Sequence, residues 1–347
     1  MVKVTESRLG TLRQKIKERK VEGFLIKKPQ NTFYLSRCWA EGGILLTKRE
    51  KFFITTSLFA EEAKSKLSGW QVVIQKDSFE EAVFQICKKL GSKKIGFETS
   101  HFSFEEYRKL GQIKGTLWIP CPGLVEKERA IKDTEEISCI RRALRVAKAT
   151  FDYVEARLRE RVTEKDLARE AIYFLRKDAD EEAFPLIVLF GERTSLPHGK
   201  PTQRRLEKNE LVLLDLGAKI EGYCSDLTRT IFFGRVKKKW HQIYHLITEA
   251  QKDALHQVKP GVICSHIDKT LREKIKEAGY GEVFLHDSGH GVGLEVHESP
   301  SITFKSKEVL KPGMVFTLEP GVYLEGEGGI RVEEMVLVTE NGGEILE

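Results

Sequence analysis

Two β-prone segments that each carry an aspartate restrict the possible folds more than any other feature of the sequence. They lie in the stretch Leu211–Phe233, with Asp215 in the first segment and Asp226 in the second. If the hairpin centre lies between Ile220 and Glu221, the two aspartates face each other with their Cβ atoms ~5 Å apart. Two buried carboxylates so close repel unless a cation or a shared proton compensates. The segment therefore favours a cation site; two solvent-facing aspartates on an edge hairpin are the alternative.

A second segment concentrates histidines. His286, His290 and His297 are three of the nine histidines in the chain and fall within twelve positions. Glycines on both sides of His290 let the backbone turn tightly and bring the imidazole close to another group. A lone histidine is usually structural, but this clustering indicates a metal-binding or proton-transfer role.

Two glutamates near the C-terminus complete the candidate set. Glu319 ends an apolar strand just before a Pro-Gly turn, where a carboxylate can enter a site without disrupting the sheet. Strand alternation places Arg331 and Glu333 on one face and Glu334 on the other. A surface ion pair with Arg331 is the alternative for Glu333. Two Asp, two Glu and one His together supply oxygen and nitrogen ligands that suit Mn, Co, Fe or Zn and could bridge two ions.

Composition excludes several classes of function. The net charge of +6 arises from 58 basic and 52 acidic residues spread over 347 positions, which indicates a mixed-sign surface rather than a nucleic-acid footprint. The N-terminus lacks the apolar core of a signal peptide, and no apolar run approaches the length of a membrane span. The six cysteines are scattered without a paired spacing, as expected for reduced thiols. We expect a cytoplasmic protein that binds neither nucleic acid nor membrane.

The pattern along the chain predicts two domains. In residues 1–125, short β-like runs alternate with helical segments that begin at capping boxes, Ser78–Glu81 and Ser103–Glu106, which predicts an α/β domain. The expected strands are Gly23–Lys27, Gly43–Thr47, Phe52–Thr55, Trp70–Ile74 and Lys94–Phe97. The segment Pro120–Gly123 is the expected linker.

Residues 126–347 are predicted to form an α+β domain. A capping box at Asp133–Glu136 begins a long helix with an apolar stripe, and a second helix follows from Thr163. Further helices are expected at Lys239–Gln257 and Cys264–Ala278, with β-hairpins between them from Leu211 onward. No clear internal sequence repeat is visible.

Four sequence blocks, in this order, resemble the proline-specific pita-bread metallopeptidases, which are Xaa-Pro aminopeptidases and prolidases. They are Asp-Leu-Gly-Ala with Ser-Asp-Leu-Thr-Arg-Thr, Gly-His-Gly-Val-Gly with Val-His-Glu, Thr-Leu-Glu-Pro-Gly, and Gly-Gly-Ile-Arg-Val-Glu. The resemblance covers the whole chain. It implies a creatinase-like N-terminal α/β domain in residues 1–125 and an α+β pita-bread catalytic domain in residues 126–347.

The resemblance also implies a set of metal ligands. Asp215 would bind one ion, Asp226 and Glu333 would bridge two ions, and His290 with Glu319 would complete the second site. The chain retains all five residue types. Two divalent ions, Mn or Co or else Zn or Fe, are the implied cofactors.

Further residues follow from the same resemblance. His198 matches a histidine beside the substrate, although a turn histidine is the plain alternative. His297 matches a histidine that steadies the scissile carbonyl, and Tyr323 lies where a tyrosine is found near the metals. Arg331 matches an arginine that supports the ligands, and Glu319 is our choice for the proton carrier.

The implied activity is hydrolysis of the peptide bond before proline in short peptides, by a homodimer. Whether the substrate is a dipeptide or a longer peptide is left open by the sequence. A metal-free creatinase-like amidinohydrolase and a metal-free binding module are the alternatives. Retention of all five ligand types argues against both.

Overall fold

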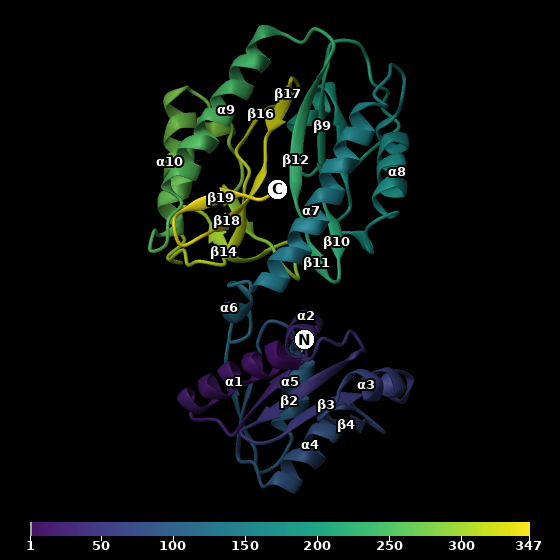
Figure 1. The fold of residues 1–347 in the computed structure, drawn as a ribbon, viewed down its shortest axis with the longest axis vertical. Helices are drawn as coiled ribbons and strands as arrows, with labels where there is room; N and C mark the ends of the chain where they lie inside the picture. The colour runs from purple at the N-terminus through teal and green to yellow at the C-terminus, as the bar shows by residue number, and fades with distance from the viewer. Residues whose placement is uncertain (1) are drawn as a thin grey trace. The chain divides into compact units, whose positions relative to one another are not determined.

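The computed structural model describes residues 2–347, and the contacts divide the chain into two units, Met1–Arg129 and Ala130–Glu347. The ribbon is shown in Figure 1. None of the helices in the described part of the chain combines the length and apolar composition that a membrane span requires.

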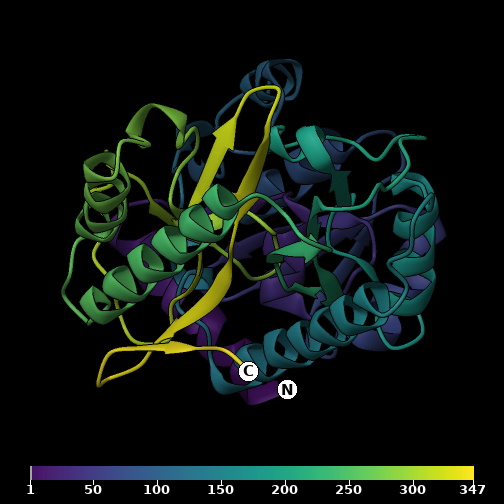
Figure 2. The ribbon, with the colours of Figure 1, turned by 90° about the horizontal axis from the view of Figure 1, so that it is seen from above.

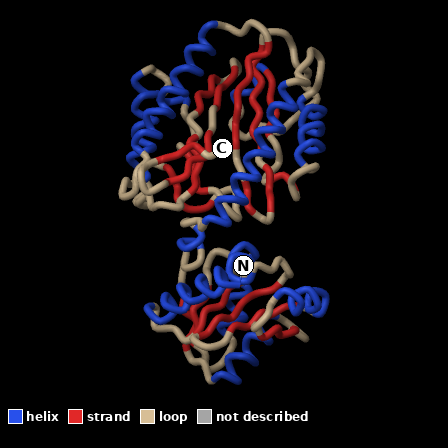
Figure 3. Tube along the Cα trace, viewed as in Figure 1, coloured by secondary structure: helices blue, strands red, loops and turns tan. Residues whose placement is uncertain are grey.

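The N-terminal unit contains a six-stranded mixed sheet, which confirms the predicted α/β class (Figure 3). Its strand order is β4-β3-β2-β1-β5-β6, and all five predicted strands are present. The strands are β1 (Gly23–Ile26), β2 (Gly42–Thr47), β3 (Lys51–Thr55), β4 (Gln71–Ile74), β5 (Lys94–Phe97) and β6 (Leu117–Pro120). The edge strand β6 was not predicted, because it runs into the proline that begins the expected linker.

Helices complete the N-terminal unit. They are α1 (Val2–Glu18), α2 (Pro29–Ser36), the 3-10 turn η1 (Ser57–Phe59), α3 (Ala60–Lys66), α4 (Phe79–Leu90), α5 (Phe104–Gly111) and α6 (Glu126–Arg129). The apolar face of α4 packs on the sheet, where Val83 and Ile86 join one buried cluster with Leu25 and Ile95. The capping box predicted at Ser103 is complete, whereas Ser78 caps its helix by accepting from the Glu81 amide.

Four long helices belong to the C-terminal unit: α7 (Thr134–Glu155), α8 (Glu164–Leu175), α9 (Lys238–Gln257) and α10 (Cys264–Glu277). The capping box at Asp133 is present, and the predicted apolar stripe of α7 is buried from Ile140 to Val154. Within this unit, α7 and α8 pair on one side of the strands and α9 and α10 on the other (Figure 1). In Figure 2, α9 runs across the strands near the C-terminus, and it contacts β16 and β17.

Short sheets lie between these two helix pairs. The first half of the unit supplies β7 (Glu181–Glu182), β8 (Ile187–Phe190), η2 (Gly191–Ser195), β9 (Glu210–Leu216), β10 (Ala218–Ile220), β11 (Tyr223–Cys224) and β12 (Leu227–Phe233). The second half supplies η3 (Gly281–Val283), β13 (Gly289–Gly291), β14 (Glu298–Ile302), β15 (Val315–Leu318), β16 (Gly321–Leu324), β17 (Gly328–Arg331), β18 (Glu334–Val338) and β19 (Gly343–Ile345). The predicted α+β class is therefore confirmed.

The hairpin that carries the two aspartates has a different register from the one predicted. Asp215 pairs with Thr228, so Asp226 is its diagonal neighbour rather than its direct partner. The turn centre lies between Glu221 and Gly222, whose φ angles are 51° and 85°. Two successive positive φ values match the twist of a two-residue hairpin turn, and glycine supplies the second at little cost. The expected direct opposition was therefore wrong.

A backbone connection at the start of α8 recurs at α10, although the sequence shows no clear repeat. Thr163 forms an isolated bridge with Arg205, and Ile263 forms one with Val309. In each case the first turn of a helix is joined to the chain that leads into a central strand.

Candidate metal centre

A pocket of about 990 Å³ in the C-terminal unit is lined by all five predicted ligands. These are Asp215, Asp226, His290, Glu319 and Glu333. They come from β9, β13, the segment before β12, and the residues that follow β15 and β17. Convergence of four carboxylates and an imidazole from separate strands is the geometry expected of a metal centre.

Three of these residues form the tightest group. One possible ligand atom each from Asp226, His290 and Glu333 lies within 4.8 Å of the others. His290 Nε2 is 3.5 Å from Asp226 Oδ2 and 3.3 Å from Glu319 Oε1, so a fourth ligand candidate borders the group. The structure therefore gathers three predicted carboxylate ligands around the imidazole of the fourth, His290.

Glycines let His290 enter this group. A Cβ atom on Gly289 would lie 1.8 Å from the carbonyl oxygen of Thr317, and one on Gly291 would lie 2.2 Å from that of Ser299. Because real Cβ atoms never approach backbone so closely, only glycine permits β13 to pair between β14 and β15. The glycines around His290 thus serve close packing between strands, and the tight turn expected from the sequence is replaced by strand β13.

Asp215 is held by Arg331. The Arg331 Nη2 donates to Asp215 Oδ2 at 2.5 Å, and both side chains are almost fully buried. Arg331 also donates to Thr228 Oγ1, to Tyr323 Oη and to the Pro197 carbonyl, each at 3.0 Å. The arginine thus fixes one carboxylate oxygen and leaves the other facing the pocket.

Two carboxylate oxygens in the pocket have no hydrogen-bond donor within the described part of the chain. They are Asp215 Oδ1 and Glu333 Oε1, and both are buried. Burial raises the pKa of Glu333 well above its usual value, and the charges of Glu319 and Asp215 raise it further. Buried acceptors without donors fit divalent cations, which take oxygen and nitrogen ligands and cancel the repulsion.

The pKa values of Asp226 and Glu319 shift in opposite directions in the same pocket. Burial raises the pKa of Asp226 well above its usual value, and the charges of Glu333 and Asp215 add to this effect. Burial also opposes the charge on Glu319, but the hydrogen bond with His290 and the neighbouring positive charges hold the pKa of Glu319 at about 2. Glu319 therefore stays charged beside the imidazole, which is the form that a metal ligand requires.

The predicted substrate residues lie at different depths. His198 and His297 are exposed and line the pocket, and the His297 ring lies 4.0 Å from that of His290. Burial, followed by the charge of His290, lowers the pKa of His297, so its neutral form is favoured. Tyr323 is buried and reaches the pocket through Arg331, and burial raises its pKa to about 12.

His286 is a pocket residue to which the sequence analysis assigned no role. Its Nε2 is 2.8 Å from Tyr323 Oη, and its Nδ1 is 3.9 Å from Glu319 Oε2. Its position four residues before His290 was the available signal. The histidine cluster pointed to the region but did not distinguish His286 from a structural histidine.

The chain matches two family profiles. Residues 138–340 match Metallopeptidase family M24, and residues 8–131 match the Creatinase/Prolidase N-terminal domain. The chain belongs to metallopeptidase family M24. Membership makes it an enzyme that depends on divalent metal ions, and the pocket supplies residues that fit such ions.

This M24 metallopeptidase is similar over nearly its whole length to proteins with named activities. It is 37% identical to the Xaa-Pro dipeptidase of Pyrococcus furiosus, covering 98% of this chain and 97% of that protein. A solved structure of an Xaa-Pro dipeptidase from Bacillus anthracis superposes with a TM-score of 0.95 at 35% identity, covering 99% of this chain and 97% of the other.

A third relative carries a different name. The X-Pro aminopeptidase from Thermotoga maritima superposes with a TM-score of 0.90 at 34% identity, covering 97% of this chain and 96% of the other. Both names thus occur among relatives of similar identity. The comparisons confirm the predicted pita-bread family and do not favour the metal-free alternatives.

Proposed function

We propose that this M24 metallopeptidase hydrolyses the bond before proline in short peptides and releases the N-terminal residue. The observation that carries the proposal is the convergence of five ligand-type side chains in one pocket, where two buried carboxylate oxygens lack donors among the described residues. Relatives named Xaa-Pro dipeptidase and X-Pro aminopeptidase support the specificity for proline.

Asp215, Asp226, His290, Glu319 and Glu333 are the proposed ligands of two divalent ions. When bound, such ions lower the pKa of water to near neutrality and polarise the scissile carbonyl. The acidic group also attracts the α-amino group of the peptide, which fixes the cut at the N-terminal bond. Mn or Co are the proposed ions, with Zn or Fe as the alternatives.

The remaining residues act directly on the peptide. His297 donates to the carbonyl oxygen as negative charge develops, because its neutral form keeps one N–H. Glu319 accepts a proton from water and returns it to the proline nitrogen, which must be protonated to leave. The apolar stretch Phe184–Ile187 lines the pocket and fits a pyrrolidine ring, which has no N–H to satisfy. His198 contacts the peptide from the same side, and Tyr323 steadies this arrangement through Arg331.

The assembly and location are proposed on the sequence alone. We propose a homodimer in the cytoplasm, with residues 1–125 as the N-terminal domain and 126–347 as the catalytic domain. Size-exclusion chromatography with light scattering tests the dimer.

Substrate choice is tested by incubating the enzyme and Mn²⁺ with Ala-Pro, Ala-Pro-Ala and Ala-Ala. We expect hydrolysis of a proline peptide at least about 100-fold faster than that of Ala-Ala, since a shaped pocket discriminates by about that factor. Cleavage of Ala-Pro alone defines a dipeptidase, and cleavage of Ala-Pro-Ala defines an aminopeptidase. Equal rates on Ala-Ala would contradict proline specificity.

Metal binding is expected to release protons. The pKa values of Asp226, Glu333 and Asp215 are raised in the metal-free pocket, mainly by burial, so these groups hold protons to higher pH than free carboxylates. A metal ion requires them deprotonated, and its affinity therefore rises with pH until they are fully ionised. Calorimetric titration with Mn²⁺ in buffers of different ionisation enthalpy measures the release. Heats that do not depend on the buffer at any pH between 5 and 7 would exclude it.

A further inference from the structure

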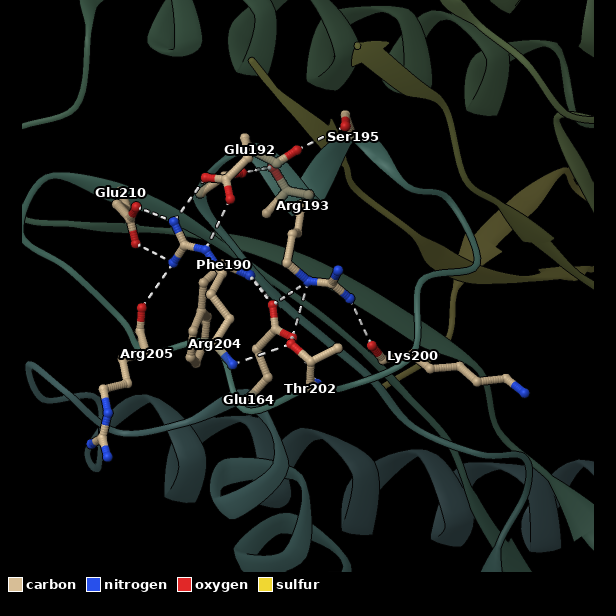
Figure 4. A network of polar contacts seen from close by, with 12 residues as sticks. Glu164, Phe190, Glu192, Arg193, Ser195, Lys200, Thr202, Arg204, Arg205 and Glu210 are labelled. Carbon is tan, nitrogen blue, oxygen red and sulfur yellow. Dashed lines mark hydrogen bonds and ion pairs between the residues drawn. The ribbon is translucent and has the colours of Figure 1, made fainter. Parts of the chain in front are cut away.

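A buried glutamate outside the metal pocket is connected to the loop that carries His198. Glu164, at the first residue of α8, has a side-chain exposure of 0%. Its carboxylate accepts from the Phe190 amide at 3.0 Å, from Arg193 Nε at 3.1 Å and 3.2 Å, and from the Thr202 amide and hydroxyl at 2.8 Å and 2.7 Å (Figure 4). Each carboxylate oxygen faces at least one N–H group, which can only donate, so the site favours a carboxylate over a group that donates.

These contacts close the segment 190–202, which we call the His198 loop. Phe190 is the last residue of β8 and Thr202 follows the pocket residue Pro201, so Glu164 holds both ends of the loop. The backbone of α8 adds to this, because the amide of Lys165 donates to the Thr202 carbonyl at 3.0 Å. The two ends of the loop are thus fixed to one helix.

Two arginines fix the middle of the His198 loop. Arg193, paired with Glu164, donates from Nη2 to the Lys200 carbonyl at 2.8 Å. Arg331, paired with Asp215, donates from Nη1 to the Pro197 carbonyl at 3.0 Å. His198 therefore lies between two anchored carbonyls, one connected to Glu164 and the other to a proposed metal ligand.

A buried ion pair is weak evidence for stability, because removing its charges from water costs about as much as their attraction returns. Such pairs are better suited to specify one conformation. Here the conformation specified is that of a loop with a single exposed histidine facing the pocket. Glu192, in the same loop, belongs to a more exposed network, in which Arg204 bridges Glu192 and Glu210.

We propose that Glu164 is a positioning residue that, through Arg193 and Thr202, holds His198 at the substrate side of the pocket. This inference rests on the proposed function for its kinetic consequence. The His198 loop is connected to the proposed metal ligands through Arg331 and not through Glu164. Loss of Glu164 should therefore reduce turnover and leave metal binding intact.

The first test is Glu164→Gln in the full-length, metal-loaded enzyme. Either orientation of the amide places an NH₂ group against a donor, so the variant should loosen the His198 loop. We expect kcat on the better proline peptide to fall by about 100-fold, the usual effect of a displacement of about 1 Å in an active site. KM should change less, and the bound metal per chain should not change. Glu192→Gln, in the same loop but exposed, is the matched control and should retain wild-type kcat.

The second test separates positioning from general damage. In a double-mutant cycle, Glu164→Gln should cost almost nothing further when His198 is already alanine, because residues that act through one another are not additive. Independent, additive losses would overturn the proposal. If Glu164→Gln fails to fold, Arg193→Gln, at a partly exposed position, replaces it with the same expected non-additivity.

A third measurement does not depend on activity. Hydrogen exchange of a peptide spanning 190–202 should be at least about 10-fold faster in Glu164→Gln than in wild type, because the Phe190 and Thr202 amides lose their acceptor. Unchanged exchange would overturn the proposed anchoring. If the wild type fails to cleave any proline peptide, the proposed function fails, and the exchange result still decides whether Glu164 holds the loop.

Discussion

Replacing Glu333 by glutamine is expected to reduce metal-dependent peptide hydrolysis by more than about 100-fold. Mutating residues that only support metal ligands already reduces metal affinity or activity by about 10- to 100-fold, and Glu333 is a proposed bridging ligand. Its Oε2 accepts from Thr228 Oγ1 at 2.7 Å, while its Oε1 is buried without a donor among the described residues. Glutamine keeps the shape but cannot supply the charge that two cations require. Steady-state kinetics with metal content measured on the same samples provides the check.

The adjacent residue offers a matched control. Glu334 lies on the other face and pairs with Arg229 at 2.6 Å. Glu334→Gln should therefore retain activity within about 3-fold, in the range of a partly exposed ion pair. Metal-free Glu333→Gln should be at least as stable as the metal-free wild type, since glutamine is neutral at every pH whereas burial opposes the charged form of Glu333. Equal activity losses in the two variants would refute the assignment of Glu333.

Replacing Arg331 by methionine should destabilise the metal-free C-terminal unit by about 3–5 kcal/mol, the usual cost of leaving a buried charge without its partner. The Arg331 side chain is 3% exposed and donates to four groups, including Asp215. The penalty should shrink when metal is added, because a cation then compensates Asp215. Urea unfolding with and without Mn²⁺, followed by the fluorescence of Trp240 in a chain whose other tryptophans are replaced by phenylalanine, measures both values.

An exposed pair in the same unit is the control for Arg331. Arg176 pairs with Glu182 at 2.6 Å, and its side chain is 53% exposed. Arg176→Met should leave the free energy of unfolding close to the wild-type value, because an exposed ion pair contributes little. A loss for Arg331→Met as small as this, or one that metal does not reduce, would contradict the proposed role of Arg331.

Most elements could be predicted because their signals are local. Capping boxes at Ser103 and Asp133 set two helix starts, and the apolar stripe of α7 identified its buried face. Side-chain alternation correctly separated Glu333 from Glu334. The ligand candidates were recognisable because charged residues inside apolar strands need compensation, wherever the strands lie.

Features that depend on distant contacts could not be predicted. The register at Asp215 was wrong because the turn is set by positive φ at Glu221, a residue type that gives no such signal. His286 is positioned by a hydrogen bond with Tyr323, which is far away in sequence. In the sequence, Glu164 looks like an ordinary acidic residue in the first turn of a helix. Its burial results from the His198 loop, which folds over it.

The most direct test of the central claim is restoration of activity to chelator-treated enzyme by stepwise addition of Mn²⁺, with Ala-Pro and Ala-Pro-Ala as substrates. The paired carboxylate pocket predicts no hydrolysis without metal and a maximum rate at two ions per chain. Full activity in chelator-treated enzyme shown to be free of metal would contradict it.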